Sequence, residues 1–156
     1  MRRLVLGLLA LLAFAAPAGA VNLVSCNDDE TTSSARNIAE PWEKNARTFS
    51  NGQIRVALLD TGGEPVCCSY HLLVLYPSGD GDQGGDEYAA CTVVNDYEGR
   101  GFVSLDFAKL AAAYDPKKGL LISFPYRVYN EDGGPQKGGI AKVRVNSKTG
   151  KVTVEK

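Results

Sequence analysis

The sequence predicts an all-β domain, an antiparallel sandwich or small barrel of about seven or eight short strands with a short N-terminal helix. Apolar and polar residues alternate along several short segments, which is the period of a half-buried strand. Turn residues, above all 17 glycines, separate these segments. A chain of 156 residues has room for one domain. We place the β domain at residues 36–156.

The first 20 residues are predicted to be a signal peptide. Arg2 and Arg3 precede an apolar run from Leu4 to Ala16, and an A-x-A cleavage pattern ends at Ala20. The run is shorter than the roughly 20 residues of a membrane span. We therefore expect an exported protein, periplasmic or extracellular, with no transmembrane span. Cleavage leaves 15 Lys and Arg against 18 Asp and Glu.

Residues 21–35 are polar and are predicted to form an extended lead, held in place through Cys26. Residues 37–48 are expected to contain the short helix, with Pro41 at a favoured first position and Trp42, Ala46 and Phe49 on one face.

Strands are expected from Ile54 onwards, where apolar residues alternate up to Leu58. The run Tyr70–Tyr76 is apolar on both faces, which is typical of a central buried strand. Further strands are predicted at 90–95, 101–107, 120–129, 140–146 and 151–155, the last two as a hairpin. Residues 108–114 fit either a helical turn or a strand. Pro125 indicates an edge strand or a bulge.

The chain has four cysteines, Cys26, Cys67, Cys68 and Cys91, and an even number in an exported chain predicts two disulfides. Adjacent side chains on a strand point to opposite faces, so Cys67 and Cys68 would pair with different partners, one with Cys26 and the other with Cys91. A direct Cys67–Cys68 bond is the alternative connectivity.

Two other fates of these cysteines stay open. Cys67, Cys68, His71 and Cys91 could form a metal site, although the spacing differs from the usual zinc pattern. Leu23 to Cys26 resembles a bacterial lipobox, in which Cys26 would carry a lipid anchor at the cell envelope.

The segment Asn51–Gly63 contains a strand that ends in Asp60-Thr61-Gly62, and it resembles the retropepsin-type aspartic protease motif. The resemblance implies a dimer in which two copies of Asp60 share a proton and activate water. Gly63 and Glu64 depart from the family pattern. The other interpretation is an ordinary turn between two strands.

The loop after the central strand carries an acidic cluster that resembles part of an EF-hand loop, Asp80, Asp82, Asp86 and Glu87. A calcium site is one interpretation, and a solvated hairpin loop is the other. We expect His71 to be a hydrogen-bonded strand residue. Phe124 and Tyr126 are expected to pack across strands, with Tyr129 near them.

A wider resemblance covers most of the chain after the leader. The segments Asn45–Leu75, Tyr114–Leu120 and Val143–Glu155 resemble a group of small secreted proteins of alphaproteobacteria. The resemblance implies an exported domain with a cysteine pair after D-T-G-G, and no particular activity.

The nearly balanced charge, 17 Lys and Arg against 18 Asp and Glu, excludes a nucleic-acid binder driven by bulk positive charge. The sequence carries no phosphate-binding loop or dinucleotide fingerprint, and we expect no cofactor. The expected function is binding or structural, in the periplasm or cell envelope, and an aspartic protease using Asp60 is the alternative.

Overall fold

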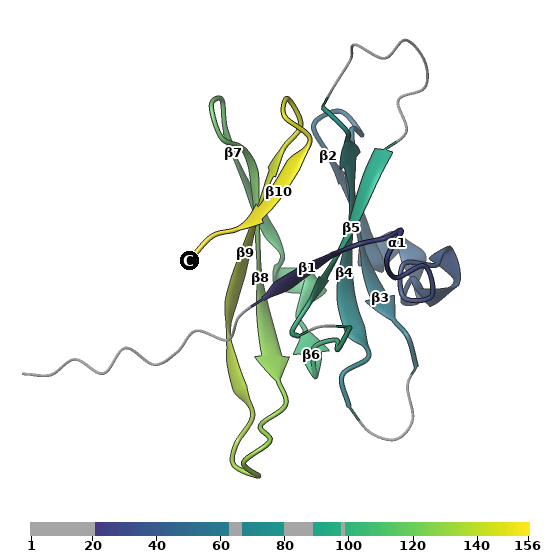
Figure 1. The fold of residues 1–156 in the computed structure, drawn as a ribbon, viewed down its shortest axis with the longest axis vertical. Coiled ribbons are helices and arrows are strands. Elements are labelled where there is room, and N and C mark those ends of the chain that lie inside the picture. Colours follow the sequence, from purple (N-terminus) through teal and green to yellow (C-terminus); the bar gives the residue numbers. More distant parts are fainter. Residues whose placement is uncertain (1–20, 63–66, 80–88, 98) are drawn as a thin grey trace, which may run out of the picture.

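In a computed structural model, the described residues 21–62, 67–79, 89–97 and 99–156 form two antiparallel five-stranded sheets that pack face to face (Figure 1). The all-β prediction is confirmed, and the sandwich is the arrangement observed. No helix within the described ranges is long and apolar enough to cross a membrane.

The first sheet is built around the strand that is apolar on both faces. This strand, β4 (Tyr70–Pro77), lies in the middle of the sheet, as predicted. Its apolar residues suit this position because both faces of the strand are covered. The strands in spatial order are β1 (Asn22–Ser25), β5 (Ala89–Asn95), β4 (Tyr70–Pro77), β3 (Ile54–Asp60) and β2 (Ala46–Phe49).

The second sheet comes from the C-terminal third of the chain. Its long strand β8 (Gly119–Val128) pairs with β9 (Lys137–Asn146) on one side. On the other side it pairs with two short strands, β6 (Ser104–Leu105) and β7 (Ala111–Asp115). A 3-10 helix, η2 (Phe107–Lys109), connects these two short strands. The strands are β10 (Lys151–Val154), β9 (Lys137–Asn146), β8 (Gly119–Val128), β6 (Ser104–Leu105) and β7 (Ala111–Asp115).

Pro125 lies in β8, in the interior of the second sheet, so the prediction of an edge strand is wrong. The proline is accommodated because the neighbouring strand changes at this point, from β6 to β7. Its carbonyl accepts from the Asp106 N–H at 3.0 Å, on the side where the ladder is interrupted. Proline has no N–H to donate, and here no regular ladder bond is lost.

The main core fills the space between the sheets. Phe102 packs edge-on against Phe124 at 6.0 Å between ring centroids and lies 5.1 Å from the ring of Tyr126. Ile54 and Val143 contribute from opposite sheets and are fully buried. Phe124 and Tyr126 therefore pack across strands as expected, whereas Tyr129 is half exposed. Burial of each large apolar side chain stabilises the fold by about 1.5–3 kcal/mol.

The outer face of the first sheet is covered by the segment of residues 26–45 (Figure 1). A second cluster of buried residues lies there, including Leu59, Leu73 and Val93, with Ile38 packed against it. The Ala39 N–H donates to the Leu58 carbonyl at 2.9 Å and fixes the segment to β3. The second sheet has no such cover in the described part of the chain.

The short helix lies within residues 37–48, as expected. A 3-10 turn, η1, spans Ala35–Asn37, and the helix α1 spans only Trp42–Asn45. From Ala46 the chain pairs with β3 instead, because the sheet offers a ladder that an exposed helix end cannot match. Trp42 accordingly remains 55% exposed.

Candidate functional site

Asp60 lies at the end of β3, at the start of a tight turn. Its Oδ1 accepts a hydrogen bond from the Gly62 N–H at 3.0 Å, and Gly62 has a φ of +62°. The Thr61 N–H donates to the Ser69 carbonyl, also at 3.0 Å. These bonds explain the Asp-Thr-Gly sequence as turn chemistry. A catalytic pair would need Asp60 of a second chain, so the geometry of one chain leaves the protease interpretation a prediction.

The cysteines pair as Cys26–Cys91 and Cys67–Cys68. The expectation that the adjacent cysteines take different partners is wrong, because it assumed a strand. Cys67 and Cys68 precede β4, and Cys68 has a φ of +78°, which no regular strand has. All four sulfurs are in disulfides, so none is available as a thiolate ligand for a metal.

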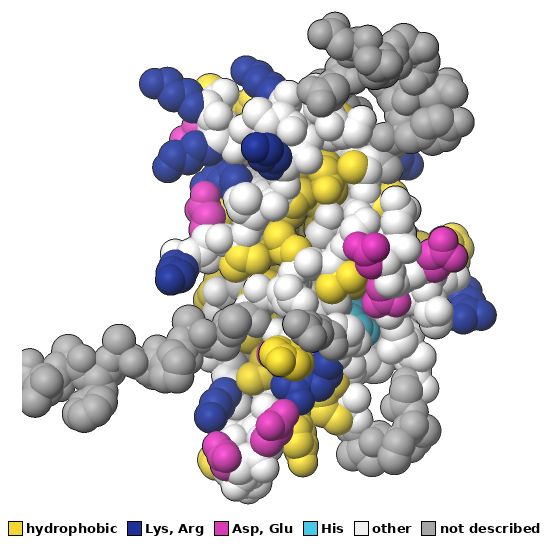
Figure 2. All heavy atoms as spheres, viewed as in Figure 1, with side chains coloured by type: hydrophobic (Ala, Val, Ile, Leu, Met, Phe, Trp, Pro, Cys, Tyr) yellow, Lys and Arg dark blue, Asp and Glu magenta, His cyan; other side chains and the backbone are white. Residues whose placement is uncertain are grey.

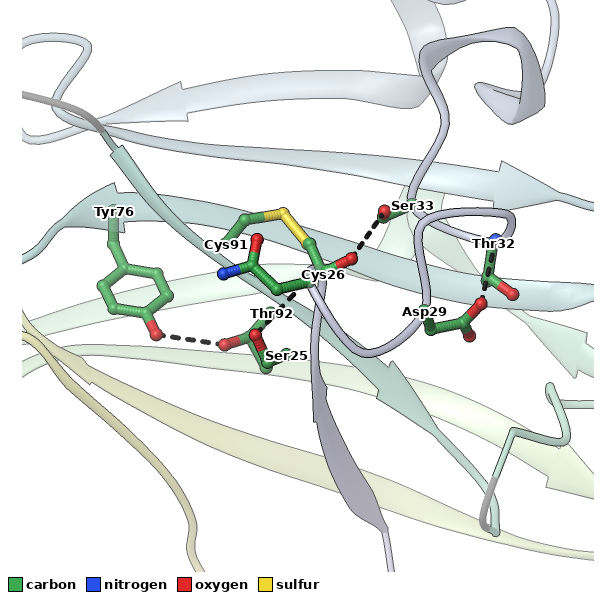
Figure 3. Close-up of a disulfide and its surroundings, with 9 residues drawn as sticks. Ser25, Cys26, Asp29, Thr32, Ser33, Tyr76, Cys91 and Thr92 are labelled. Atoms are coloured by element: carbon green, nitrogen blue, oxygen red, sulfur yellow. Dashed lines mark hydrogen bonds between the residues drawn. A yellow bond between two sulfur atoms is a disulfide. The ribbon is translucent and has the colours of Figure 1, made fainter.

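The Cys26–Cys91 bond fastens the first residues after β1 to β5 (Figure 3). The Cys26 N–H also donates to the Cys91 carbonyl at 3.2 Å, and the Ser33 hydroxyl donates to the Cys26 carbonyl at 3.4 Å. The bond therefore holds both β1 and the start of the covering segment. A thiol in this disulfide is not free to carry a lipid, so the two fates of Cys26 are alternatives.

The acidic cluster Asp80, Asp82, Asp86 and Glu87 lies outside the described residues, so the calcium interpretation stays a prediction. Within the described ranges, no three His, Cys, Asp or Glu side chains come together in a way that could hold a metal ion.

His71 lies on β4 beneath the covering segment and is 2% exposed. Its Nδ1 lies 2.6 Å from the Asn95 Oδ1, so this nitrogen carries the proton and donates it to the amide oxygen. Burial lowers the pKa of His71, although the Asn95 bond and the charges of Asp29 and Asp60 oppose the shift. The expectation of a hydrogen-bonded strand histidine is confirmed. The Asn95 Nδ2 has no partner among the described residues.

Arg100 connects the two sheets at one end of the sandwich. Its guanidinium donates to Asp96 at 2.9 Å and to Glu131 at 2.8 Å. Burial raises the pKa of the Asp96 carboxyl, and the bond to Arg100 opposes this shift. This contact was not anticipated from the sequence, because Arg100 and Glu131 are 31 residues apart.

A groove opens along one side of the sandwich, between β1 and β10. Figure 2 shows a band of hydrophobic side chains that is exposed between the two sheets on this side. The groove has a volume of about 450 Å³. Its lining is more polar than apolar, and Val152 is the lining residue that comes from the second sheet. The lining residues are Leu23, Ser25, Asn27, Tyr76, Ala90, Cys91, Thr92 and Val152.

The polar groups of the groove are fixed by the surrounding structure. The Tyr76 hydroxyl and the Thr92 hydroxyl are 3.0 Å apart and form one hydrogen bond (Figure 3). The Ser25 hydroxyl accepts from the Asn27 N–H at 3.3 Å. The Cys26–Cys91 disulfide lies directly behind them and holds β1 as one wall. The groove thus combines apolar side chains with oriented polar groups, and such groups can fix the orientation of a ligand.

No family model, curated protein or solved structure matches this chain. The physical features of the groove are therefore the basis for its interpretation.

The groove could not be predicted from local sequence patterns, because Leu23 and Val152 come from opposite ends of the domain. Leu23 lies in the segment predicted as a polar extended lead, and Val152 lies in a predicted strand. Only the placement of β1 and β10 as the edge strands on the same side of the sandwich brings them together.

Proposed function

We propose that this protein is exported and acts in the periplasm or cell envelope as a binding domain, with the groove between β1 and β10 as its site. The signal-peptide pattern of residues 1–20 supports export. The Cys26–Cys91 disulfide supports an oxidising compartment, since such bonds are rare in reducing cytosol.

The proposed ligand is an extended peptide segment with apolar side chains at alternate positions. β1 and β10 are each paired on one side only in the described structure, so each has a free backbone edge. An added strand can bond to such an edge, and its alternate side chains can enter the groove. Both edge strands have four residues, which matches a segment of roughly 13 Å.

The observation that carries this proposal is the groove of mixed apolar and polar lining between two unpaired strand edges. The test uses a soluble peptide of alternating valine and threonine, followed by amide NMR. We expect shifts and exchange protection in β1 or β10 together with changes at Leu23 and Val152. Saturable binding with no change in either strand would overturn the proposed site.

Two variants in the groove and one control locate the binding. Val152→Lys places a charge in the groove and is expected to abolish peptide binding, and Leu23→Lys tests the other wall. Tyr114→Lys is the matched control, because Tyr114 lines a different hollow beside Phe49. Circular dichroism verifies that all three variants fold. Equal loss of binding in the control would contradict the groove as the site.

The aspartic protease alternative makes the opposite prediction for Asp60. Asp60→Asn would abolish peptide cleavage if two copies of Asp60 form a catalytic pair. The binding proposal expects no cleavage by the native protein and unchanged peptide affinity in this variant.

Export has its own test, intact mass measurement of the protein recovered from the periplasm or medium. We expect a chain that begins at Val21 and has no alkylatable thiol before reduction. A lipid mass on a chain that begins at Cys26 would instead establish the envelope anchor.

A further inference from the structure

Charge is unevenly divided between the two sheets, although the chain as a whole is nearly neutral. Residues 104–156, which build the second sheet, contain ten Lys and Arg against five Asp and Glu. Residues 21–103 contain five against thirteen. In Figure 2, most of the Lys and Arg side chains in view lie over the second sheet. The domain therefore has a basic side and an acidic side.

The outer face of the second sheet has no covering segment among the described residues. The strand register places small and apolar residues in adjacent rows on this face, and none of the described elements covers them. Ile140 lies opposite Pro125 and is 58% exposed. The small and apolar residues on this face are Ala111, Ala113, Leu121, Ser123, Pro125 and Ile140.

Cations lie within this bare face and at the hairpin tips beside it. Lys142 and Arg127 are exposed and lie on either side of Ile140 along the sheet. Lys118 and Lys151 are exposed near the tips of the two adjacent hairpins. Arg127, Lys118 and Lys151 make no ion pair with any described residue. Arg144 differs, because Glu155 pairs with it through two bonds of 2.8 and 3.0 Å.

We propose that the outer face of the second sheet docks on an anionic lipid surface. An exposed isoleucine between exposed cations suits the boundary of a bilayer, where apolar groups enter the headgroup layer and cations meet phosphates. A two-fold dimer through the same face would bring two basic sheets together, and like charges oppose that arrangement. Charge complementarity therefore favours an anionic partner. This surface is separate from the groove between β1 and β10.

The test is cosedimentation of the purified protein with vesicles of phosphatidylcholine, with or without phosphatidylglycerol. We expect binding only to the vesicles that contain phosphatidylglycerol, and weaker binding as salt is added. Each cation near such a surface contributes about a fivefold increase in partition coefficient. The double variant Arg127→Gln/Lys142→Gln should therefore bind about 25-fold more weakly.

The matched control is Arg36→Gln/Arg55→Gln, which removes the same charge from exposed positions outside the second sheet. It should retain nearly all of the vesicle binding, and Ile140→Ser should lose part of it. Equal binding to neutral vesicles, or an equal loss in the control, would overturn the proposal. The proposal would also be overturned if sedimentation equilibrium without lipid shows a dimer and the double variant abolishes that dimer. Circular dichroism confirms folding of each variant.

Discussion

Removal of the Cys26–Cys91 disulfide should cost the domain a large part of its stability. The bond joins residues 65 positions apart, and it restricts the unfolded chain far more than the folded one. The chain-entropy relation gives about 4 kcal/mol for a loop of this length. Domains of this size are stable by roughly 5–15 kcal/mol, so the double variant Cys26→Ala/Cys91→Ala should still fold, although with little margin.

The assay is urea unfolding followed by far-ultraviolet circular dichroism. The free energy of unfolding should fall by about 4 kcal/mol, which corresponds to a fall in Tm of roughly 15 °C. The m-value should rise, because the unfolded chain without the cross-link exposes more surface. Alanine is used in place of serine because Cys26 is buried among apolar residues.

The double variant Cys67→Ala/Cys68→Ala is the matched control, since its bond joins neighbouring residues and closes almost no loop. Its unfolding free energy should change by much less than that of the Cys26/Cys91 variant. A loss below about 1 kcal/mol for Cys26/Cys91, or equal losses for the two pairs, would refute the loop-closure reasoning.

Three further outcomes follow from contacts elsewhere in the fold. The folded-state pKa of His71 lies below its unfolded value of about 6.5. The contribution of neutral His71 to the free energy of unfolding should therefore be fully present above that pH and should fall as the pH drops below it. Unfolding titrations measure this dependence, and His71→Gln should weaken it. Arg47 donates to the Leu110 and Ala108 carbonyls at 2.8 and 3.2 Å and lies over the Phe107 ring. Arg47→Met should therefore lower the free energy of unfolding in urea by about 1.5–3 kcal/mol. Arg55→Met, at an exposed position, should change it little. Gly119 and Gly52 both have a φ near +90°. A Cβ on Gly119 would clash with the Val145 carbonyl oxygen, whereas a Cβ on Gly52 would lie in open space. Gly52→Ala should therefore cost about 1–2 kcal/mol, and thermal unfolding should show a larger loss for Gly119→Ala.

Local patterns in the sequence predicted the strands well, because burial and period depend on nearby residues. The run Tyr70–Tyr76, apolar on both faces, is the central strand, and the C-terminal alternation forms the predicted hairpin. The same reasoning failed for Cys67 and Cys68. Their pairing depends on a backbone conformation with positive φ that no side-chain pattern reveals.

The two proposed binding surfaces were harder to predict, for different reasons. The groove depends on the spatial order of strands from the two ends of the domain, which local periodicity does not determine. The basic face was present in the sequence, as ten cations against five acids in residues 104–156. The net charge of the whole chain does not reveal this face, because the excess acidic residues of the first sheet cancel the excess cations of the second.

The disulfide connects stability with the proposed function, because it lies behind one wall of the groove. β1 has only four residues and pairs with β5 alone, so the cross-link reinforces the strand pairing and the packing of Leu23 against the core. Cys91 itself lines the groove, and Ser25 directly precedes Cys26. Reduction would therefore release the wall that carries Leu23 before it disturbed β10, whose pairing with β9 is independent of the bond. A strand held at an open edge in this way can keep a groove ready for an extended ligand without closing it, and we expect reduction of the disulfide to weaken ligand binding.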